Sequence, residues 1–232
     1  VSDKKNIYLY QNADDVLVLN KDNEYSKEFA KEAKGKVEWF SKNDWSDTDQ
    51  LLVPGGHNKA NAEAAKIVGR ILSISEEEIV KTLSTFTGLS HRLERVAVIN
   101  DVAYINDSAS TTPIAAITAI NAFPDKHIIL ISGGNTKNLP MDEFIELIEK
   151  RVKKVILYEG TAYGHFGSLS NTIGQFKLGE FNDVVKSAQE NASPGDIVLF
   201  SPGLTHLPVI NEFERGDRYK EAVARIQKAN SH

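Results

Sequence analysis

The spacing of apolar and polar residues changes near residue 88, and this change divides the chain into two parts. In the first part, short apolar runs separated by turn residues predict a mixture of strands and helices. A capping box, in which the side chains of Ser75 and Glu78 bond each other's backbone N–H groups, marks the start of one helix. The elements predicted for this part are strands at 7–9, 16–19 and 37–40 and helices at 25–33, 58–71 and 76–86.

In the second part, strands and helices alternate after an opening hairpin whose turn contains Asp101. The predicted elements are strands at 96–100, 103–106, 127–132, 154–158 and 196–200 and helices at 113–122, 140–150, 181–192 and 208–228. Residues 160–180 show no clear pattern. Alternation of this kind is typical of a parallel sheet with crossover helices. We therefore predict an α/β fold with a mainly parallel sheet and a domain boundary near Leu89.

Composition narrows the class of protein. The 232 residues are 41% apolar and 25% charged, which is typical of a globular protein with a real core. The net charge of −5 disfavours a nucleic-acid partner, because phosphate binding needs a basic face. Cysteine is absent, as is common in reducing compartments, and neither a signal peptide nor a membrane-spanning run is visible. We expect a cytoplasmic monomer that binds neither nucleic acid nor membrane.

Glycine and polar residues follow two of the predicted strands, at the edge where open α/β sheets bind ligands. Gly133-Gly134 allows close approach of the backbone to a ligand, and Lys137 offers a positive charge to a phosphate or carboxylate. Asp107 can bind ribose hydroxyls, and the hydroxyl run 110–112 before Pro113 can offer N–H groups to an anion. The ordinary alternatives are a tight turn with a solvated lysine and a helix cap.

Two further clusters lie elsewhere in the chain. Arg92 can bind a nucleotide phosphate through two hydrogen bonds, although a His91-Arg92 pair is more often ordinary surface. Asn58 and Asn61, near His57 at a helix start, can recognise the edge of a base or merely cap the helix. The sequence has no metal-site spacing, no G-x-G-x-x-G fingerprint and no G-x-x-x-x-G-K-[ST] phosphate loop.

In their order along the chain, these clusters resemble the Mur ligase family. The motifs that carry the resemblance are His-Asn-x-x-Asn at 57–61, Phe-Thr-Gly-Leu-x-His-Arg-Leu-Glu at 86–94, Asn-Asp-Ser at 106–108, Gly-Gly-x-x-Lys at 133–137, Pro-Gly-Asp-x-Val-Leu-Phe-Ser-Pro at 194–202 and Phe-Glu-Arg-Gly-x-x-Tyr at 213–219. The resemblance implies that residues 1–88 are the C-terminal part of the family's central ATPase domain. It implies that residues 89–232 are the complete C-terminal Rossmann-like domain.

The resemblance is strongest to the members that add D-glutamate to a UDP-muramoyl peptide precursor, UDP-N-acetylmuramoyl-L-alanine, in peptidoglycan synthesis. It implies that ATP and Mg²⁺ convert a substrate carboxylate into an acyl phosphate, which the amine of D-glutamate then attacks. It also implies that Asn58 and Asn61 lie beside the adenine, that Arg92 contacts the nucleotide phosphates and that Asp107 contacts the ribose.

For D-glutamate, the resemblance implies a site formed by Lys137, Thr111 and Thr205. We expect Thr111 and Lys137 to follow adjacent strands. This chain has Ala109 where the family has a lysine, and either Thr205 or His206 fills the position of a family serine. Val209 or Ile210 stands where the family has a phenylalanine. The phosphate loop, the Mg²⁺ ligands and a carbamylated lysine belong upstream in the family.

Two hypotheses follow for the activity of the chain. In the first, the chain is a part of an ATP-dependent amide ligase that is inactive alone. In the second, it is a non-catalytic, divergent module that binds a nucleotide or an amino acid.

Overall fold

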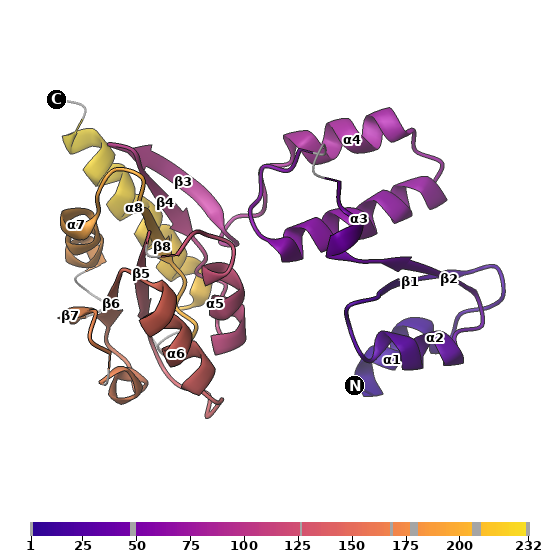
Figure 1. The fold of residues 1–232 in the computed structure, drawn as a ribbon, viewed down its shortest axis with the longest axis horizontal. Coiled ribbons are helices and arrows are strands. Elements are labelled where there is room, and N and C mark those ends of the chain that lie inside the picture. The colour runs from indigo at the N-terminus through magenta and orange to yellow at the C-terminus, as the bar shows by residue number, and fades with distance from the viewer. Residues whose placement is uncertain are drawn as a thin grey trace. The chain divides into compact units, whose positions relative to one another are not determined.

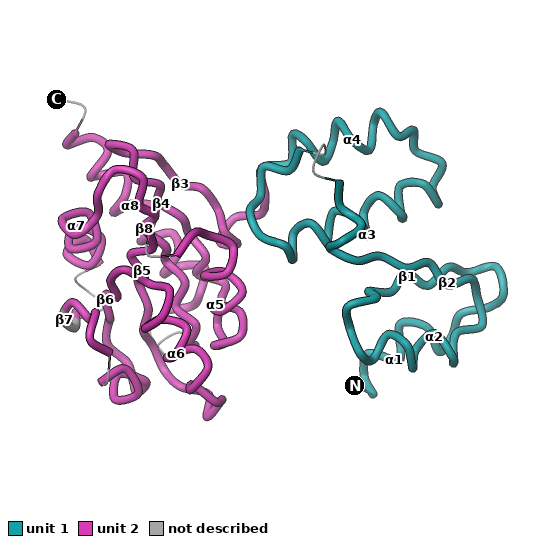
Figure 2. Tube along the Cα trace, in the orientation of Figure 1, with its two compact units in different colours: residues 1–87 teal, residues 88–232 magenta. Residues whose placement is uncertain are grey.

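The chain divides into two compact units, residues 1–87 and 88–232 (Figure 2). The structure is a computed structural model that describes residues 2–46, 50–125, 127–167, 169–176, 181–205 and 210–230. His206 and Val209, two of the positions singled out above, lie outside the described residues.

Unit 1, residues 1–87, contains a two-stranded parallel sheet and four α-helices (Figure 1). Its elements are α1 (Ser2–Leu9), β1 (Val16–Asn20), α2 (Ser26–Glu32), β2 (Lys36–Phe40), a 3₁₀ turn (Lys42–Asp44), α3 (Gly56–Ile71) and α4 (Glu76–Thr85). A small core gathers around the buried side chains of Tyr8, Leu17 and Leu19. The predicted helix start is confirmed, because Ser75 is the N-cap of α4 and its Oγ accepts from the Glu78 N–H. The Glu78 carboxylate accepts from the Ser75 hydroxyl and not from the Ser75 N–H, so one half of the capping box is formed.

The predicted strand at 7–9 is wrong, because this segment belongs to helix α1. The alternation of Ile7 and Leu9 fits a strand, but the buried residue is Tyr8 between them, whereas Ile7 is 73% exposed. Tyr8 packs against Phe29 and donates its hydroxyl hydrogen to Glu32. The long-range contacts of one aromatic side chain therefore outweigh the local pattern.

Unit 2, residues 88–232, is a six-stranded sheet with helices on both faces (Figure 1). Its elements are β3 (Glu94–Ile99), β4 (Val102–Asn106), α5 (Pro113–Ile120), β5 (Ile128–Gly133), α6 (Asp142–Arg151), β6 (Lys154–Tyr158), a 3₁₀ turn (Tyr163–Phe166), β7 (Thr172–Phe176), α7 (Phe181–Asn191), β8 (Ile197–Phe200) and α8 (Glu212–Ala229). The strand order is β3-β4-β8-β5-β6-β7, and β3 is antiparallel to its neighbour while the other pairs are parallel. The α/β fold with a mainly parallel sheet is confirmed.

The sheet of unit 2 has a separate apolar core on each face. Ile128 and Leu130 of β5 pack into the core that includes α5 and α6, and Ile129 and Ile131 pack into the core that includes α7 and α8. All four side chains are fully buried. Neither face of this strand is exposed to solvent, so both faces carry apolar residues, which explains the continuous apolar run in the sequence.

The predicted hairpin between β3 and β4 is also confirmed. Asn100 and Asp101 have φ values of 51° and 61°, as a two-residue turn of the hairpin type requires. Strand β7 was not predicted, since it lies at the sheet edge within the unpatterned stretch 160–180.

The connection between the units should be the first point of proteolytic attack. Phe86, Thr87 and Leu89 are exposed, whereas His91 and Leu93 are buried. Exposed connecting backbone is the preferred site of nicking, so brief treatment with chymotrypsin should cut first between residues 86 and 90. Mass spectrometry of the fragments checks this, and a first cut within 113–158 would contradict it.

Candidate functional site

Three loops meet at the carboxyl edge of the parallel strands in unit 2. They are the β4 loop (107–112), the β5 loop (134–138) and the β8 loop (201–205). The Gly203 N–H donates to the Ser110 carbonyl at 3.0 Å, and Asn135 and Thr205 exchange two backbone hydrogen bonds of 3.1 Å. The β8 loop is therefore bonded to both of the other loops.

The order of the strands corrects the expected placement of Thr111 and Lys137. These residues follow β4 and β5, but β8 lies between these two strands and pairs with both. Thr111 and Lys137 therefore do not follow adjacent strands, and the β8 loop, which carries Thr205, separates them. The sequence did not indicate this order, because the last strand along the chain is inserted between two earlier ones.

Asp107 ties the β4 loop to its surroundings. Its carboxylate Oδ2 accepts hydrogen bonds from the hydroxyls of Ser110 (2.5 Å) and Ser201 (2.7 Å), and Oδ1 accepts from the Leu93 N–H (3.2 Å). Burial raises the pKa of Asp107, and these hydrogen bonds and the charge of Arg92 oppose the rise. Both oxygens already have partners in the protein, so Asp107 has a structural role whether or not it meets a ligand.

The glycine pair of the β5 loop permits close packing of the backbone. Gly133 and Gly134 have φ values of 145° and 117°, which other residues rarely adopt. A Cβ atom on Gly134 would lie 2.3 Å from the Thr205 carbonyl oxygen. The two glycines are therefore explained by close backbone packing at the end of β5, and the role of Lys137 stays a prediction.

The side chains of Lys137 and Thr205 are available at this edge. Lys137 is exposed, and its ammonium makes no hydrogen bond or ion pair with the described residues. Thr205 is half-buried, and its backbone is fixed by Asn135. The arrangement offers a cation and hydroxyls to an anionic ligand.

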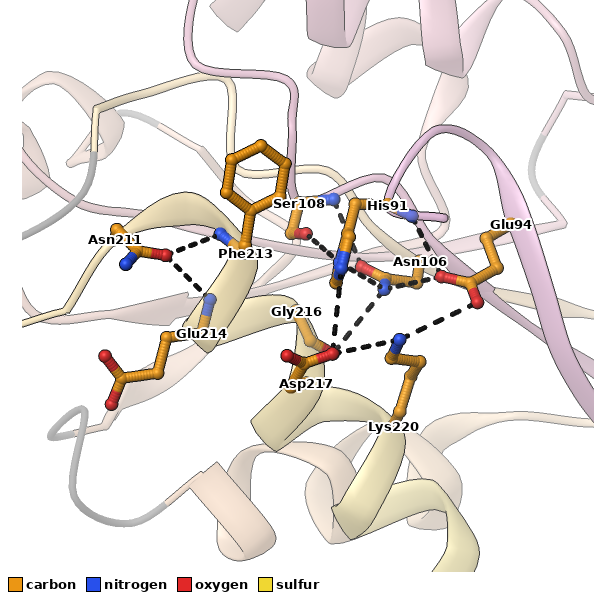
Figure 3. A network of polar contacts seen from close by, with 10 residues as sticks. All are labelled: His91, Glu94, Asn106, Ser108, Asn211, Phe213, Glu214, Gly216, Asp217 and Lys220. Carbon is orange, nitrogen blue, oxygen red and sulfur yellow. Dashed lines mark hydrogen bonds and ion pairs between the residues drawn. The ribbon is translucent and has the colours of Figure 1, made fainter. Parts of the chain in front are cut away.

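A network around His91 links the start of unit 2 to helix α8 (Figure 3). His91 is buried, with 8% of the residue exposed, and its Nδ1 lies 3.1 Å from Ser108 Oγ and 3.2 Å from Asn106 Nδ2. The amide nitrogen of Asn106 can only donate, so Nδ1 accepts and Nε2 carries the proton toward Asp217, 3.6 Å away. The surface interpretation is wrong for His91, whereas Arg92 beside it is exposed.

Helix α8 supplies two residues that had no role predicted for them, although both lie in the Phe-Glu-Arg-Gly motif. Arg215 is buried, and it donates hydrogen bonds to the carbonyls of Ser108 and Leu204 and to the hydroxyl of Tyr158. Gly216 lies against His91 and Ser108 (Figure 3). Local sequence patterns do not predict the burial of an arginine, because it depends on tertiary packing.

The two asparagines proposed for the adenine lie at the start of helix α3 in unit 1. Asn58 Nδ2 donates to the Pro54 carbonyl at 2.7 Å, and Asn61 Nδ2 lies 3.4 Å from Asn58 Oδ1. Gly55 is the N-cap of this helix, so neither asparagine caps it. Burial lowers the pKa of His57, so its imidazole is neutral near pH 7.

Within the described part of the chain, no group of three or more His, Asp or Glu side chains could hold a metal ion. None of the helices among these residues is long and apolar enough to cross a membrane.

Comparison with known proteins identifies the family. The model of the Mur ligase glutamate ligase domain matches residues 91–204. The UDP-N-acetylmuramoylalanine–D-glutamate ligase of Acetivibrio thermocellus is 35% identical over 98% of this chain and 55% of its own length. The enzyme of the same name from Streptococcus uberis is 32% identical over 97% of this chain and 54% of its own length. The chain belongs to the Mur ligase family, and it spans about half the length of these relatives.

Solved structures agree on the fold. The MurF ligase of Thermotoga maritima in complex with ADP has a TM-score of 0.72 and 16% identity, over 97% of this chain and 57% of that protein. A MurF structure from Acinetobacter baumannii has a TM-score of 0.70 at 16% identity, over 97% of this chain and 54% of that protein.

Substitution of Gly216 tests the packing of α8 against the His91 network. A Cβ atom there would lie 2.2 Å from Ser108 Oγ and 2.3 Å from His91 Nδ1. Overpacking costs about 1–3 kcal/mol, more than the 0.5–1 kcal/mol or so that Ala gains over Gly within a helix. Gly216→Ala should therefore lower the free energy of unfolding. Circular dichroism during urea unfolding measures this free energy. Tryptophan fluorescence does not suit the purpose, because both tryptophans lie in unit 1 and Gly216 lies in unit 2.

Gly164→Ala is the matched control, because a Cβ atom there would meet nothing within 4 Å. Equal stability of the Gly216→Ala and Gly164→Ala variants would contradict the close approach.

Proposed function

We propose that the chain is part of an ATP-dependent ligase that adds D-glutamate to UDP-N-acetylmuramoyl-L-alanine in peptidoglycan synthesis. The similarity to D-glutamate ligases over nearly the whole chain supports the reaction. One structural observation supports the role of unit 2. Lys137 is exposed and has no partner among the described residues, and its β5 loop is hydrogen-bonded to the β8 loop, which carries the hydroxyl of Thr205. A dicarboxylate amino acid needs that combination of groups.

Lys137, Thr205 and Thr111 form the proposed amino-acid site. Lys137 would bind a carboxylate of D-glutamate through its ammonium, and the hydroxyls of Thr205 and Thr111 would donate to carboxylate oxygens. Because the β8 loop is hydrogen-bonded to the β4 and β5 loops, the three side chains would be held in a fixed relation. A fixed carboxylate leaves the amine of the amino acid oriented for attack, which is where positioning contributes to the rate.

Each unit has its own proposed nucleotide contacts, Asn58 and Asn61 in unit 1 and Arg92 and Asp107 in unit 2. The exposed guanidinium of Arg92 suits a phosphate, and its charge acts on Asp107. Asp107 would bind a ribose hydroxyl only through lone pairs left over from its three hydrogen bonds. Asn61 is exposed and suits the edge of a base, whereas Asn58 already bonds Pro54.

For Mg²⁺, which proteins usually bind through one or two carboxylates together with phosphate oxygens, we propose ligands that lie mostly upstream, as the resemblance implies. ATP and a UDP-linked substrate are intracellular compounds, and we expect the parent ligase to act as a monomer in the cytoplasm.

The shape of unit 1 supports its assignment to a larger domain. Its sheet has two parallel strands, whereas parallel sheets are normally larger and covered on both faces. Ile7 and Tyr10 are largely exposed, and a cavity of about 490 Å³ is lined by Ile7, Leu17, Leu19 and Phe29, among others. We propose that unit 1 is the C-terminal part of the central ATPase domain of the family.

The second candidate function is a non-catalytic module that binds a nucleotide or an amino acid. The absence of a phosphate loop from the sequence and the presence of Ala109 favour it. The two candidates differ in what the longer protein does, and they agree that this chain alone lacks the groups that normally surround the β- and γ-phosphates.

Replacement of Lys137 tests the amino-acid site. A charge-assisted hydrogen bond contributes about 1.5–3 kcal/mol, so Lys137→Ala should weaken D-glutamate binding roughly ten- to a hundredfold. Titration with D-glutamate, followed by the NMR signals of the Asn135 and Thr205 amides, measures the affinity. Lys228→Ala, at the far end of α8 beside the β3–β4 turn, is the control. An unchanged affinity in Lys137→Ala, or no binding by the wild-type chain, would overturn the assignment.

Purified chain should not hydrolyse ATP. The phosphate loop, whose N–H groups and lysine normally hold the β- and γ-phosphates, is absent from the 232 residues. A phosphate-release assay checks this. Steady release that is lost in an Arg92→Ala variant, and unchanged in Lys228→Ala, would contradict the prediction.

A further inference from the structure

Arg215 is the largest side chain among the fully buried residues, with 1% of its surface exposed. It lies in the second turn of α8, whose first turn is fixed by Asn211: the side chain of Asn211 accepts from the N–H groups of Phe213 and Glu214. The Arg215 N–H also donates to the Asn211 carbonyl. The guanidinium therefore projects from a rigid support.

The guanidinium of Arg215 joins two of the three loops. Its Nη2 donates to the Ser108 carbonyl at 2.9 Å and to the Leu204 carbonyl at 3.1 Å, and its Nη1 donates to the Tyr158 hydroxyl at 3.1 Å. Ser108 lies in the β4 loop and Leu204 precedes Thr205 in the β8 loop. A planar fork of donors can reach all three acceptors, whereas a single ammonium cannot hold the same geometry.

The positive charge of Arg215 has no anionic partner among the described residues. Burial raises the pKa of Tyr158, so its hydroxyl is neutral at physiological pH, and the other two acceptors are backbone carbonyls. The Arg215 Nε atom likewise has no hydrogen-bond acceptor within the part of the chain that the structure describes. Burial of an uncompensated cation costs several kcal/mol, so the charge calls for an anion that the described protein does not supply.

We propose that Arg215 is a positioning residue of the amino-acid site. It fixes the loops that carry Thr111 and Thr205, and its charge favours a carboxylate bound at those loops without touching it. The identity of the ligand rests on the proposed function, whereas the fixing of the loops does not.

Hydrogen–deuterium exchange of the whole chain tests the fixing of the loops. In Arg215→Lys, which keeps the charge but loses the fork, the amides of Gly203 and Thr205 should exchange about tenfold faster, as loss of about 1.4 kcal/mol implies. The amides of β5 should keep their protection. Arg218→Lys is the control, because Arg218 is exposed on the same helix and bonds Glu214. Unchanged loops, or equal loss of protection in β5, would overturn the proposal.

A second measurement reports on the site itself. D-Glutamate should bind Arg215→Lys about tenfold more weakly than the wild type. In Arg215→Ala, added guanidinium ion should restore binding, whereas methylammonium should not, because the missing group is a fork of donors. Rescue of this kind does not follow from a merely structural role. Equal affinity in the wild type and Arg215→Lys would refute the positioning role.

The wild-type protein provides a test that does not depend on the folding of a variant. The NMR signal of the Arg215 Nε–H should shift during titration with D-glutamate, with the same midpoint as the Thr205 amide. Absence of that shift while Thr205 responds would overturn the proposal. If neither signal responds, the proposed function fails, and the exchange experiment still decides whether Arg215 fixes the loops.

Discussion

The pairing of β8 with both β4 and β5 is the constraint on which the rest of unit 2 depends. It places the β8 loop between the β4 and β5 loops and lets its backbone bond to each of them. Gly134 permits this approach at one side, and Asp107 secures the other side through Ser201. A strand that comes late in the sequence thereby organises residues that come more than sixty positions earlier.

Much of the fold was predictable because the buried elements of this chain have clear apolar patterns and the helix starts have local signals. Strand β5 is covered on both faces and reads as an unbroken apolar run, and the Ser75 capping box is a purely local signal. The failures occurred where tertiary contacts decide. Segment 7–9 becomes helical around the buried Tyr8, and β7 is an edge strand with little apolar pattern.

The candidate site was predictable in its residues and unpredictable in its arrangement. Lys137 and the hydroxyl run 110–112 could be singled out because they follow strands at the ligand-binding edge of such sheets. Their assignment to D-glutamate, and the choice of Thr205, came only from the resemblance to the Mur ligase family. Their relative placement depends on strand order, which local patterns do not encode. Arg215 escaped notice because an arginine on an amphipathic helix normally faces water, and here packing alone places it in the interior.

The distribution of charge is compatible with the proposed anion site in a protein whose net charge is −5. Arg92 and Lys137 are exposed at the carboxyl edge of unit 2, and Arg215 is buried behind the same loops. Fields between exposed charges are screened within about 8–10 Å at physiological salt, so a small ligand responds to nearby cations and not to the net charge. A long polyanion covers a wide surface and responds to the whole. The proposed site for an amino acid with two carboxylates is therefore compatible with a net charge that disfavours nucleic acid.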